Sequence, residues 1–237
     1  MSGKRLVNAA ERLIVALDVP TLPEALALAD GLAGVVSFFK VGLELYTVAG
    51  PRAVEELRRR GHRVFLDLKL FDVPATVERA ARAAARSGAT FLTVHAGGAT
   101  VAAAVAGAGT SGLQVLAVTV LTSLDANDLR EMGCPDPVDV VVLRRAQLAQ
   151  RQGAAGVIAS PLEVAALKAA LPSPFYVIAP GIRPQGADAG DQKRLATPAA
   201  ALAAGADYLV VGRPITRAPD PAAAARAILA EMQAALP

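Results

Sequence analysis

Three charged residues stand close together after a short apolar run at residues 64–66: Asp67, Lys69 and Asp72. Because side chains alternate along a strand, Asp67 and Lys69 point to the same side. An ammonium held between carboxylates can stabilise a carbanion and give it a proton. The alternative is structural, with Asp67 and Lys69 as an ion pair and Asp72 as a helix cap before Pro74.

Short runs rich in β-branched residues recur along the chain and predict strands. The predicted strands are Leu13–Val19, Val36–Val41, Val64–Leu68, Phe91–His95, Val115–Leu121, Gly156–Ala159, Phe175–Ala179 and Tyr208–Val211. The segments between them have helical spacing, and capping boxes at Thr21–Glu24 and Ser160–Glu163 predict two helix starts. Alternating strands and helices indicate parallel βαβ units.

Eight such units in 237 residues favour one domain, residues 1–237, with the α/β architecture of a (β/α)8 TIM barrel. A doubly wound open sheet is the alternative, but no GxGxxG motif follows the first strand. In these barrels the chemistry takes place at the carboxyl ends of the strands. Polar residues stand at or near those predicted ends: Asp18, Lys40, Asp67, Lys69, His95 and Thr122.

The loops after the last two strands suit a phosphate. Gly212 allows close approach of an anion to the backbone, Pro214 presets a helical turn, and Arg213 supplies a guanidinium. The long segment 181–197 carries Arg183 and Gln192 and is interpreted as a lid over the phosphate. The alternative is a solvated surface insertion.

Composition excludes several other classes. The net charge is only +3, without the basic stripe that nucleic-acid binding requires. The single cysteine, Cys134, excludes an internal disulfide and has no partner at a metal-site spacing. No apolar run is long enough to span a membrane, and the first 12 residues lack the apolar core of a signal peptide. We expect a cytoplasmic protein with neither nucleic acid nor membrane as a partner.

Five segments together resemble the bacterial type of the orotidine 5′-phosphate decarboxylase family over nearly the whole chain. They are Asp67-Leu-Lys-Leu-Phe-Asp-Val-Pro-Ala-Thr76, Leu121-Thr-Ser123, Pro180-Gly-Ile-Arg-Pro184, Asp191-Gln-Lys-Arg194 and Gly212-Arg-Pro-Ile-Thr216. The resemblance implies decarboxylation of orotidine 5′-phosphate to UMP, the last step of pyrimidine nucleotide synthesis, without metal or cofactor. Lys69 would protonate C6 of the pyrimidine and stabilise the carbanion, and Asp67 would lie beside the substrate carboxylate.

The remaining roles also follow from the resemblance. Lys40 and Asp18 would hold ribose hydroxyls, with Lys40 also joining the charged array. Asp72 and Thr76 would reach into the active site of a second subunit of a homodimer. Thr122 would contact the pyrimidine, and the phosphate would be bound by Arg183, Gln192, Gly212 and Arg213.

The chain departs from the family at Phe71, often histidine, and at Ala75, often asparagine, which bears on the dimer contacts around Asp72. His95 is interpreted as a support for the rim, and His62, beside Gly61, as a surface loop residue.

Two alternatives stay open. One is a magnesium-dependent phosphosugar decarboxylase or aldolase on the same scaffold, although Lys40 would repel the metal ion where an extra carboxylate is needed. The other is a non-catalytic phosphate-binding barrel.

Overall fold

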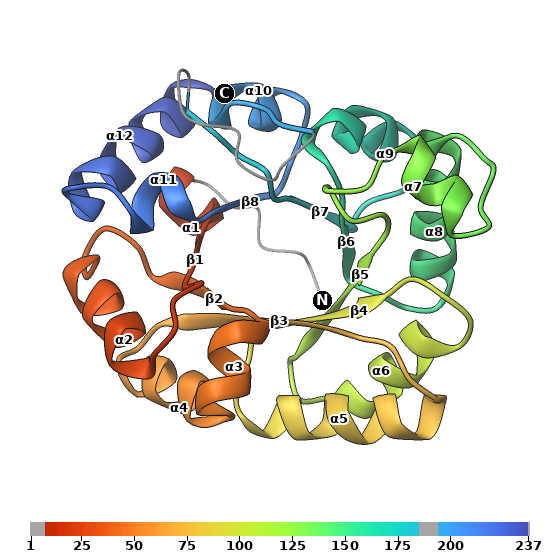
Figure 1. The fold of residues 1–237 in the computed structure, drawn as a ribbon, viewed down its shortest axis with the longest axis horizontal. Coiled ribbons are helices and arrows are strands. Elements are labelled where there is room, and N and C mark those ends of the chain that lie inside the picture. Colours follow the sequence, from red (N-terminus) through yellow and green to blue (C-terminus); the bar gives the residue numbers. More distant parts are fainter. Residues whose placement is uncertain (1–7, 185–193, 237) are drawn as a thin grey trace.

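The eight strands form one closed, all-parallel barrel in chain order, from β1 to β8 and back to β1 (Figure 1). The computed structural model describes residues 8–184 and 194–236. The strands are β1 Leu13–Ala16, β2 Phe38–Val41, β3 Arg63–Leu70, β4 Phe91–His95, β5 Gln114–Val118, β6 Gly156–Ile158, β7 Tyr176–Ala179 and β8 Tyr208–Val211. This confirms the predicted (β/α)8 TIM barrel.

Helices surround the strands as an outer ring (Figure 1). They are α1 Ala9–Arg12, α2 Leu22–Gly31, α3 Leu43–Ala49, α4 Arg52–Arg59, α5 Pro74–Arg86, α6 Thr100–Ala108, α7 Ala126–Glu131, α8 Val138–Arg151, η1 Pro161–Glu163, α9 Val164–Ala170, α10 Pro198–Ala203, α11 Arg213–Thr216 and α12 Pro221–Ala234. The sequence predicted one helix after each strand. Two helices follow β2 because Gly50, at positive φ, and Pro51 interrupt the helical segment.

Both predicted helix starts are confirmed. The Thr21 hydroxyl accepts a hydrogen bond from the Glu24 N–H at the start of α2. Ser160 and Glu163 form a reciprocal capping box, which opens the 3-10 turn η1 before α9.

Successive side chains along each strand point alternately into the barrel and out toward the helices, which creates two cores. Inside the barrel lies a cluster rich in aromatic side chains, in which the Phe91 ring centroid is 5.4 Å from that of Phe38 and 5.3 Å from that of Tyr208. Between strands and helices lies a larger aliphatic core. The inward residues Phe38, Phe65 and Phe91 form the floor beneath the next inward positions, which are Lys40, Asp67 and Thr93.

Several predicted strands are longer than the observed ones. The strand β1 ends at Ala16 rather than Val19, and β5 ends at Val118 rather than Leu121. The apolar sequence continues in both cases because Leu17 and Val120 are buried beyond the ends of these strands, and the Leu17 N–H still donates to the Lys40 carbonyl. A hydrophobic run in the sequence therefore indicates burial, whereas the end of a strand depends on backbone pairing.

The interpretation of His62 as a surface residue is wrong. Its side chain is buried and packs edge-on against Phe39, with ring centroids 4.8 Å apart. Burial lowers the pKa of His62. The neighbouring Gly61 does form the expected turn, with φ at 81°, but the turn directs the imidazole inward.

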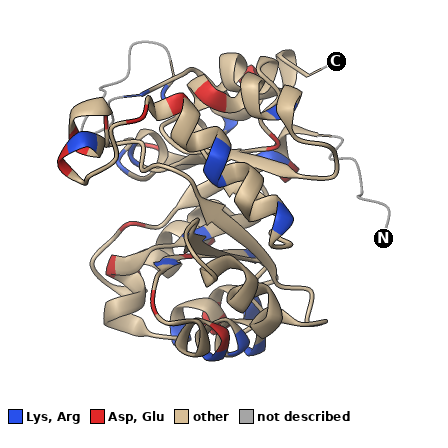
Figure 2. Ribbon diagram, turned by 90° about the vertical axis from the view of Figure 1, so that its right-hand side faces the viewer, with Lys and Arg blue, Asp and Glu red and all other residues tan. Residues whose placement is uncertain are grey.

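Acidic and basic segments are interspersed over the helices seen in Figure 2. Many arginines are paired within their own helix, such as Arg82 with Glu78 on α5 and Arg60 with Glu56 at the end of α4. Across residues 8–184 and 194–236, no helix is both long enough and apolar enough to cross a membrane.

Candidate active site

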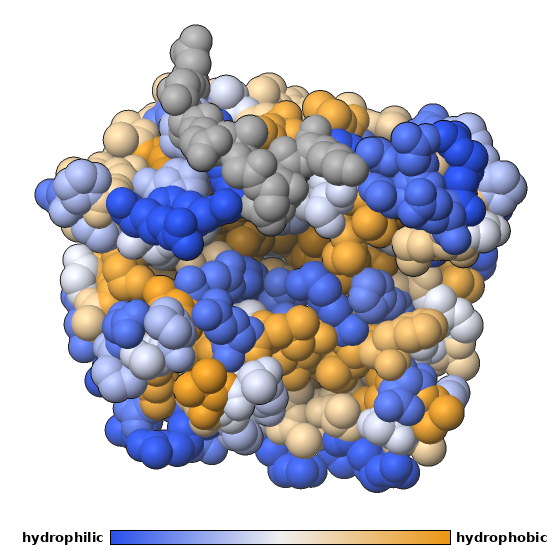
Figure 3. Space-filling view, in the orientation of Figure 1, coloured by the Kyte–Doolittle hydropathy of each residue, from blue (hydrophilic) through white to orange (hydrophobic). Residues whose placement is uncertain are grey.

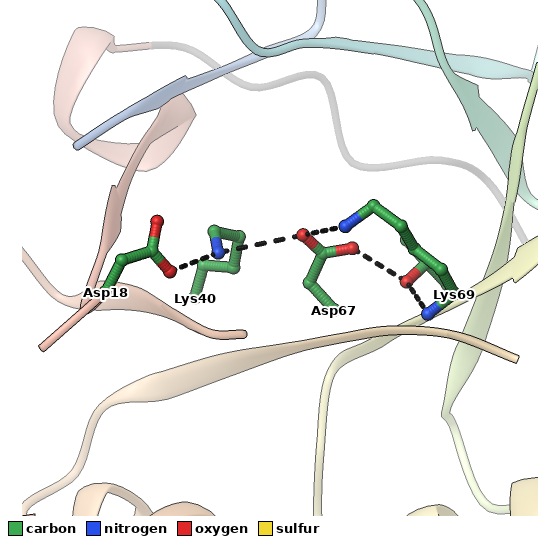
Figure 4. A network of polar contacts seen from close by, with 5 residues as sticks. Asp18, Lys40, Asp67 and Lys69 are labelled. Carbon is green, nitrogen blue, oxygen red and sulfur yellow. Dashed lines mark hydrogen bonds and ion pairs between the residues drawn. The ribbon is translucent and has the colours of Figure 1, made fainter. Parts of the chain in front are cut away.

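Four charged side chains form a continuous array across the barrel mouth (Figure 4). The Nζ atom of Lys40 lies 2.8 Å from Oδ1 of Asp18 and 3.6 Å from Oδ2 of Asp67. The Nζ atom of Lys69 lies 2.8 Å from the same Oδ2. Charges alternate in sign along the array, so each ammonium stabilises its neighbouring carboxylates.

Burial differs along the array. Lys40 and Asp67 are buried, the side chain of Lys69 is 28% exposed, and that of Asp18 is 55% exposed. Burial alone raises the pKa of Asp67, but the charges of Lys40 and Lys69 and hydrogen bonds from Lys69 and Thr93 outweigh it. The pKa of Asp67 therefore lies below its ordinary value, and the carboxylate is ionised at neutral pH.

Strands β2 and β3 and the loop after β1 place these residues. Lys40 belongs to β2, Asp67 and Lys69 to β3, and Asp18 follows β1 by two residues. Lys69 has a positive φ of 51°, which is uncommon for a residue with a side chain and costs of order 1–3 kcal/mol. Such strain persists only where surrounding contacts hold it, and the contact with Asp67 is one of them.

A cavity of about 540 Å³ lies over this array. The space-filling view shows hydrophilic residues gathered across the hollowed middle of the face seen in Figure 1, with hydrophobic residues beside them (Figure 3). The apolar floor includes Phe65 and Ile158. The predicted residues that line the cavity are Asp18, Lys40, Asp67, Lys69, Thr122, Arg183, Gly212 and Arg213.

The expected phosphate-binding residues come from two neighbouring loops. Gly212 is the N-cap residue of the short helix α11, which begins at Arg213. The Arg183 backbone N–H donates to the Ala196 carbonyl, so both ends of the loop after β7 are joined. Gln192 and the middle of the predicted lid lie outside the described residues. Thr122 lies in the loop after β5, four residues beyond the end of the strand.

Asp72 and Thr76 are absent from the residues that line this cavity. The Asp72 side chain is exposed and accepts a hydrogen bond from the Val73 N–H at 2.6 Å. The alternative reading of Asp72 as the helix cap is wrong, because Val73 is the N-cap residue of α5 and no side chain caps that helix. Thr76 lies in the first turn of α5 and is half-buried.

Thr93, a buried residue in the middle of β4, was not predicted as a site residue, yet its hydroxyl hydrogen-bonds to Asp67. Glu44, to which no role in the site was assigned, also lines the cavity. Thr93 could have been found, because it is two residues from the inward-facing Phe91 and so shares its side of the strand.

His95 lies at the end of β4, with its ring 6.0 Å from that of the exposed Phe71. Burial lowers the pKa of His95, and the charges of Lys69 and Arg145 act in the same direction. His95 is outside the set of residues that line the cavity. Its interpretation as a support for the rim stays a prediction.

Three carboxylates, Asp18, Glu44 and Asp67, line the cavity and raise the question of a metal ion. The Lys40 ammonium lies between Asp18 and Asp67, where it provides a positive charge for both. Among the described residues, no three of the His, Cys, Asp and Glu side chains are grouped as metal ligands.

Comparisons with known proteins match nearly the whole chain. The family described as "Orotidine 5'-phosphate decarboxylase / HUMPS family" matches residues 11–228. The orotidine 5′-phosphate decarboxylase of Anaeromyxobacter sp. (strain K) is 57% identical over 223 residues, covering 93% of this chain and 97% of its own. That of Moorella thermoacetica is 50% identical, covering 96% and 94% respectively.

A solved structure is also similar. The crystal structure of orotidine 5′-phosphate decarboxylase from Lactobacillus acidophilus has a TM-score of 0.83 and 41% sequence identity, covering 93% of this chain and 98% of its own. Both the sequence and the fold of the chain match these proteins over nearly its full length. The chain therefore belongs to the orotidine 5′-phosphate decarboxylase / HUMPS family.

Proposed function

We propose that this protein decarboxylates orotidine 5′-phosphate to UMP, the last step of pyrimidine nucleotide synthesis. The observation that carries the proposal is the contact between Lys69 Nζ and Asp67 Oδ2, 2.8 Å apart in a cavity that three arginines also line. The relatives named as orotidine 5′-phosphate decarboxylases, at up to 57% identity over 93% of the chain, support the same reaction.

The reaction is driven by electrostatics. The substrate carboxylate lies beside Asp67, and two unit charges about 4 Å apart repel by roughly 4 kcal/mol at an effective dielectric constant of 20. As the bond between C6 and the carboxyl carbon breaks, carbon dioxide leaves and the repulsion vanishes. The electron pair stays on C6, where attraction to the Lys69 ammonium grows. Lys69 then gives its proton to C6 and is reprotonated from solvent.

The rest of the substrate is held away from the reacting carbon. Asp18 and Lys40 bind ribose hydroxyls, and Thr122 contacts the pyrimidine. The phosphate is bound by Arg183, Gln192, Gly212 and Arg213. Among the described residues, a Cβ on Gly212 would meet only Ala16 Cβ, at 3.5 Å, which leaves room there for a phosphate oxygen. Binding at the phosphate orients C6 against Lys69.

The working enzyme is a homodimer in this proposal. Asp72 is exposed, and large apolar side chains are exposed near it in the sequence, including Phe71 and Val73. Leu43 and Val48 on α3 are exposed as well. A second subunit covers these residues and receives Asp72 and Thr76 at its own cavity.

Mixed dimers test the shared site. We expect the Lys69→Ala and Asp72→Ala proteins each to be nearly inactive. When the two are mixed and exchange subunits, about half of the dimers become heterodimers, and each heterodimer has one intact site. The mixture should therefore recover about a quarter of wild-type activity. A mixture no more active than its parents would contradict the shared site.

A magnesium-dependent phosphosugar reaction is the second candidate, because the matched family also includes HUMPS proteins. The position of Lys40 between Asp18 and Asp67 favours the metal-independent reaction, because its ammonium lies where a magnesium ion would need these carboxylates as ligands. The test is conversion of orotidine 5′-phosphate in excess EDTA, followed by loss of orotate absorbance and identification of UMP. Rapid conversion supports the proposal; magnesium-dependent turnover of a phosphosugar alone would overturn it.

A further inference from the structure

The ladder between β3 and β4 is interrupted at the charged array. Leu66 pairs with Leu92, but the next register pair is Leu70 with Val94. Three residues of β3, from Asp67 to Lys69, therefore lie opposite a single residue of β4, which is Thr93. On its other side, β4 keeps a regular register with β5, including the pair Thr93 and Leu116. The irregularity is a bulge on β3 alone, a device that redirects side chains next to active sites.

Thr93 connects to both ends of this bulge through its hydroxyl group. The hydroxyl donates to Asp67 Oδ1 at 2.8 Å and accepts from the Lys69 backbone N–H at 2.9 Å. The ionised carboxylate can only accept, and the N–H can only donate, so the single hydroxyl proton is committed to Asp67. Thr93 is fully buried, so water does not replace either bond at its surface.

The two hydrogen bonds have separate consequences. Because Oδ1 of Asp67 is held by Thr93, Oδ2 is turned toward Lys69 and Lys40. Because the bulge removes regular pairing, the Lys69 N–H uses the Thr93 hydroxyl as its acceptor, at the residue where φ is 51°. One side chain thus fixes the carboxylate orientation and the backbone that carries the reactive ammonium.

We propose that Thr93 is a positioning residue for decarboxylation, which orients Asp67 and Lys69 through one hydroxyl group without touching the substrate. This inference rests on the proposed function. The alternative is that Thr93 only fills space in the barrel, in which case its methyl group matters and its hydroxyl does not.

Two substitutions separate these roles. Thr93→Val keeps the shape of the side chain and removes the hydroxyl, whereas Thr93→Ser keeps the hydroxyl and removes the methyl group. We expect Thr93→Val to lower kcat about 10- to 100-fold, with KM changed less than about threefold. Thr93→Ser stays within about threefold of wild type in both constants. Binding of UMP, measured by calorimetry, should be unchanged in both variants because the residues that bind the phosphate are not altered.

The pH profile gives a second readout. Asp67 faces Lys40 on β2, Lys69 on β3 and the Thr93 hydroxyl on β4, with Asp18 beyond Lys40 and His95 at the end of β4. Loss of a hydrogen bond to the ionised carboxylate raises its pKa, so the acid limb of kcat/KM moves to higher pH in Thr93→Val and not in Thr93→Ser.

Equal losses in Thr93→Val and Thr93→Ser, or a Thr93→Val enzyme as active as wild type, would overturn the inference. Should Thr93→Val not fold, Thr93→Ala takes its place with the same control. A crystal structure of the variant is independent of the reaction: a rotated Asp67 carboxylate or altered Lys69 backbone supports the inference, and an unmoved pair refutes it. Failure of the wild-type enzyme to form UMP would instead count against the proposed function.

Discussion

The Nζ atom of Lys40 lies 3.6 Å from Oδ2 of Asp67, an oxygen already bound by Lys69 at 2.8 Å. Two ammonium groups thus face one carboxylate oxygen from two adjacent strands, β2 and β3. This arrangement keeps Asp67 ionised despite burial and leaves the Lys69 ammonium directed into the cavity.

The charge of Lys40 is the largest influence that lowers the pKa of Asp67. Lys40→Met removes it, so the pKa of Asp67 rises and the acid limb of the kcat/KM profile moves to higher pH. We also expect kcat/KM at neutral pH to fall about 100-fold or more, because one buried ion-pair partner is lost. The control is Lys168→Met, which breaks an ion pair with Asp207 outside the cavity. An unshifted acid limb in Lys40→Met would contradict the account.

Asp67 also links stability to pH. Because its pKa is lowered by folding, its contribution to the free energy of unfolding is fully present above the ordinary carboxyl pKa, about 3.9, and disappears as the pH falls through the lower folded-state value. Asp67→Asn should cost about 3 kcal/mol at neutral pH, since both lysines lose their buried partner. Urea unfolding at several pH values should show the difference from wild type shrinking in acid. A difference independent of pH would mean that Asp67 stabilises the fold by other means.

Gly42, at the start of α3, tests the geometry of the array. A Cβ there would lie 2.8 Å from Asp18 Oδ1 and 2.8 Å from Lys40 Nζ. Both atoms are at the ends of side chains that can move, so Gly42→Ala should displace the ion pair rather than unfold the protein. We expect kcat/KM to fall at least about tenfold while the free energy of unfolding changes by less than about 1 kcal/mol.

Gly31→Ala provides the matched control, because no atom of the described residues, beyond its chain neighbours and the nearby backbone of α2, lies within 4 Å of a Cβ at that position. It should leave activity unchanged and stabilise the helix by a few tenths of a kcal/mol or more. Equal activity of the Gly42 and Gly31 variants would show that the Asp18–Lys40 contact is not needed for turnover.

The barrel was predictable because strand and helix patterns alternate through the whole sequence. The charged array was predictable for a related reason: parallel strands in a closed barrel bring their carboxyl ends together, so Lys40 and Asp67 had to meet. Strand ends were less predictable, as the buried Leu17 beyond β1 illustrates.

The hydrogen bonds of Thr93 and the burial of His62 were not predicted, because the local sequence does not reveal which residues a side chain contacts. A threonine inside an apolar strand is typical of β structure, and only the bulge on β3 brings its hydroxyl to Asp67 and Lys69. His62 follows a glycine turn, which is typical of a surface, yet it packs on Phe39. The assignment of Asp72 and Thr76 to a second subunit depends on another chain and stays a prediction.

The proposed mechanism depends on the Lys69 ammonium, which would stabilise the carbanion and protonate C6. The most direct measurement is kcat/KM for orotidine 5′-phosphate with Lys69→Ala, beside wild type and Lys168→Ala. Loss of an interaction worth roughly 4 kcal/mol predicts a fall of about a thousandfold or more for Lys69→Ala, with UMP still bound and the Lys168 variant active. A Lys69→Ala enzyme that decarboxylates within about tenfold of wild type would contradict the account.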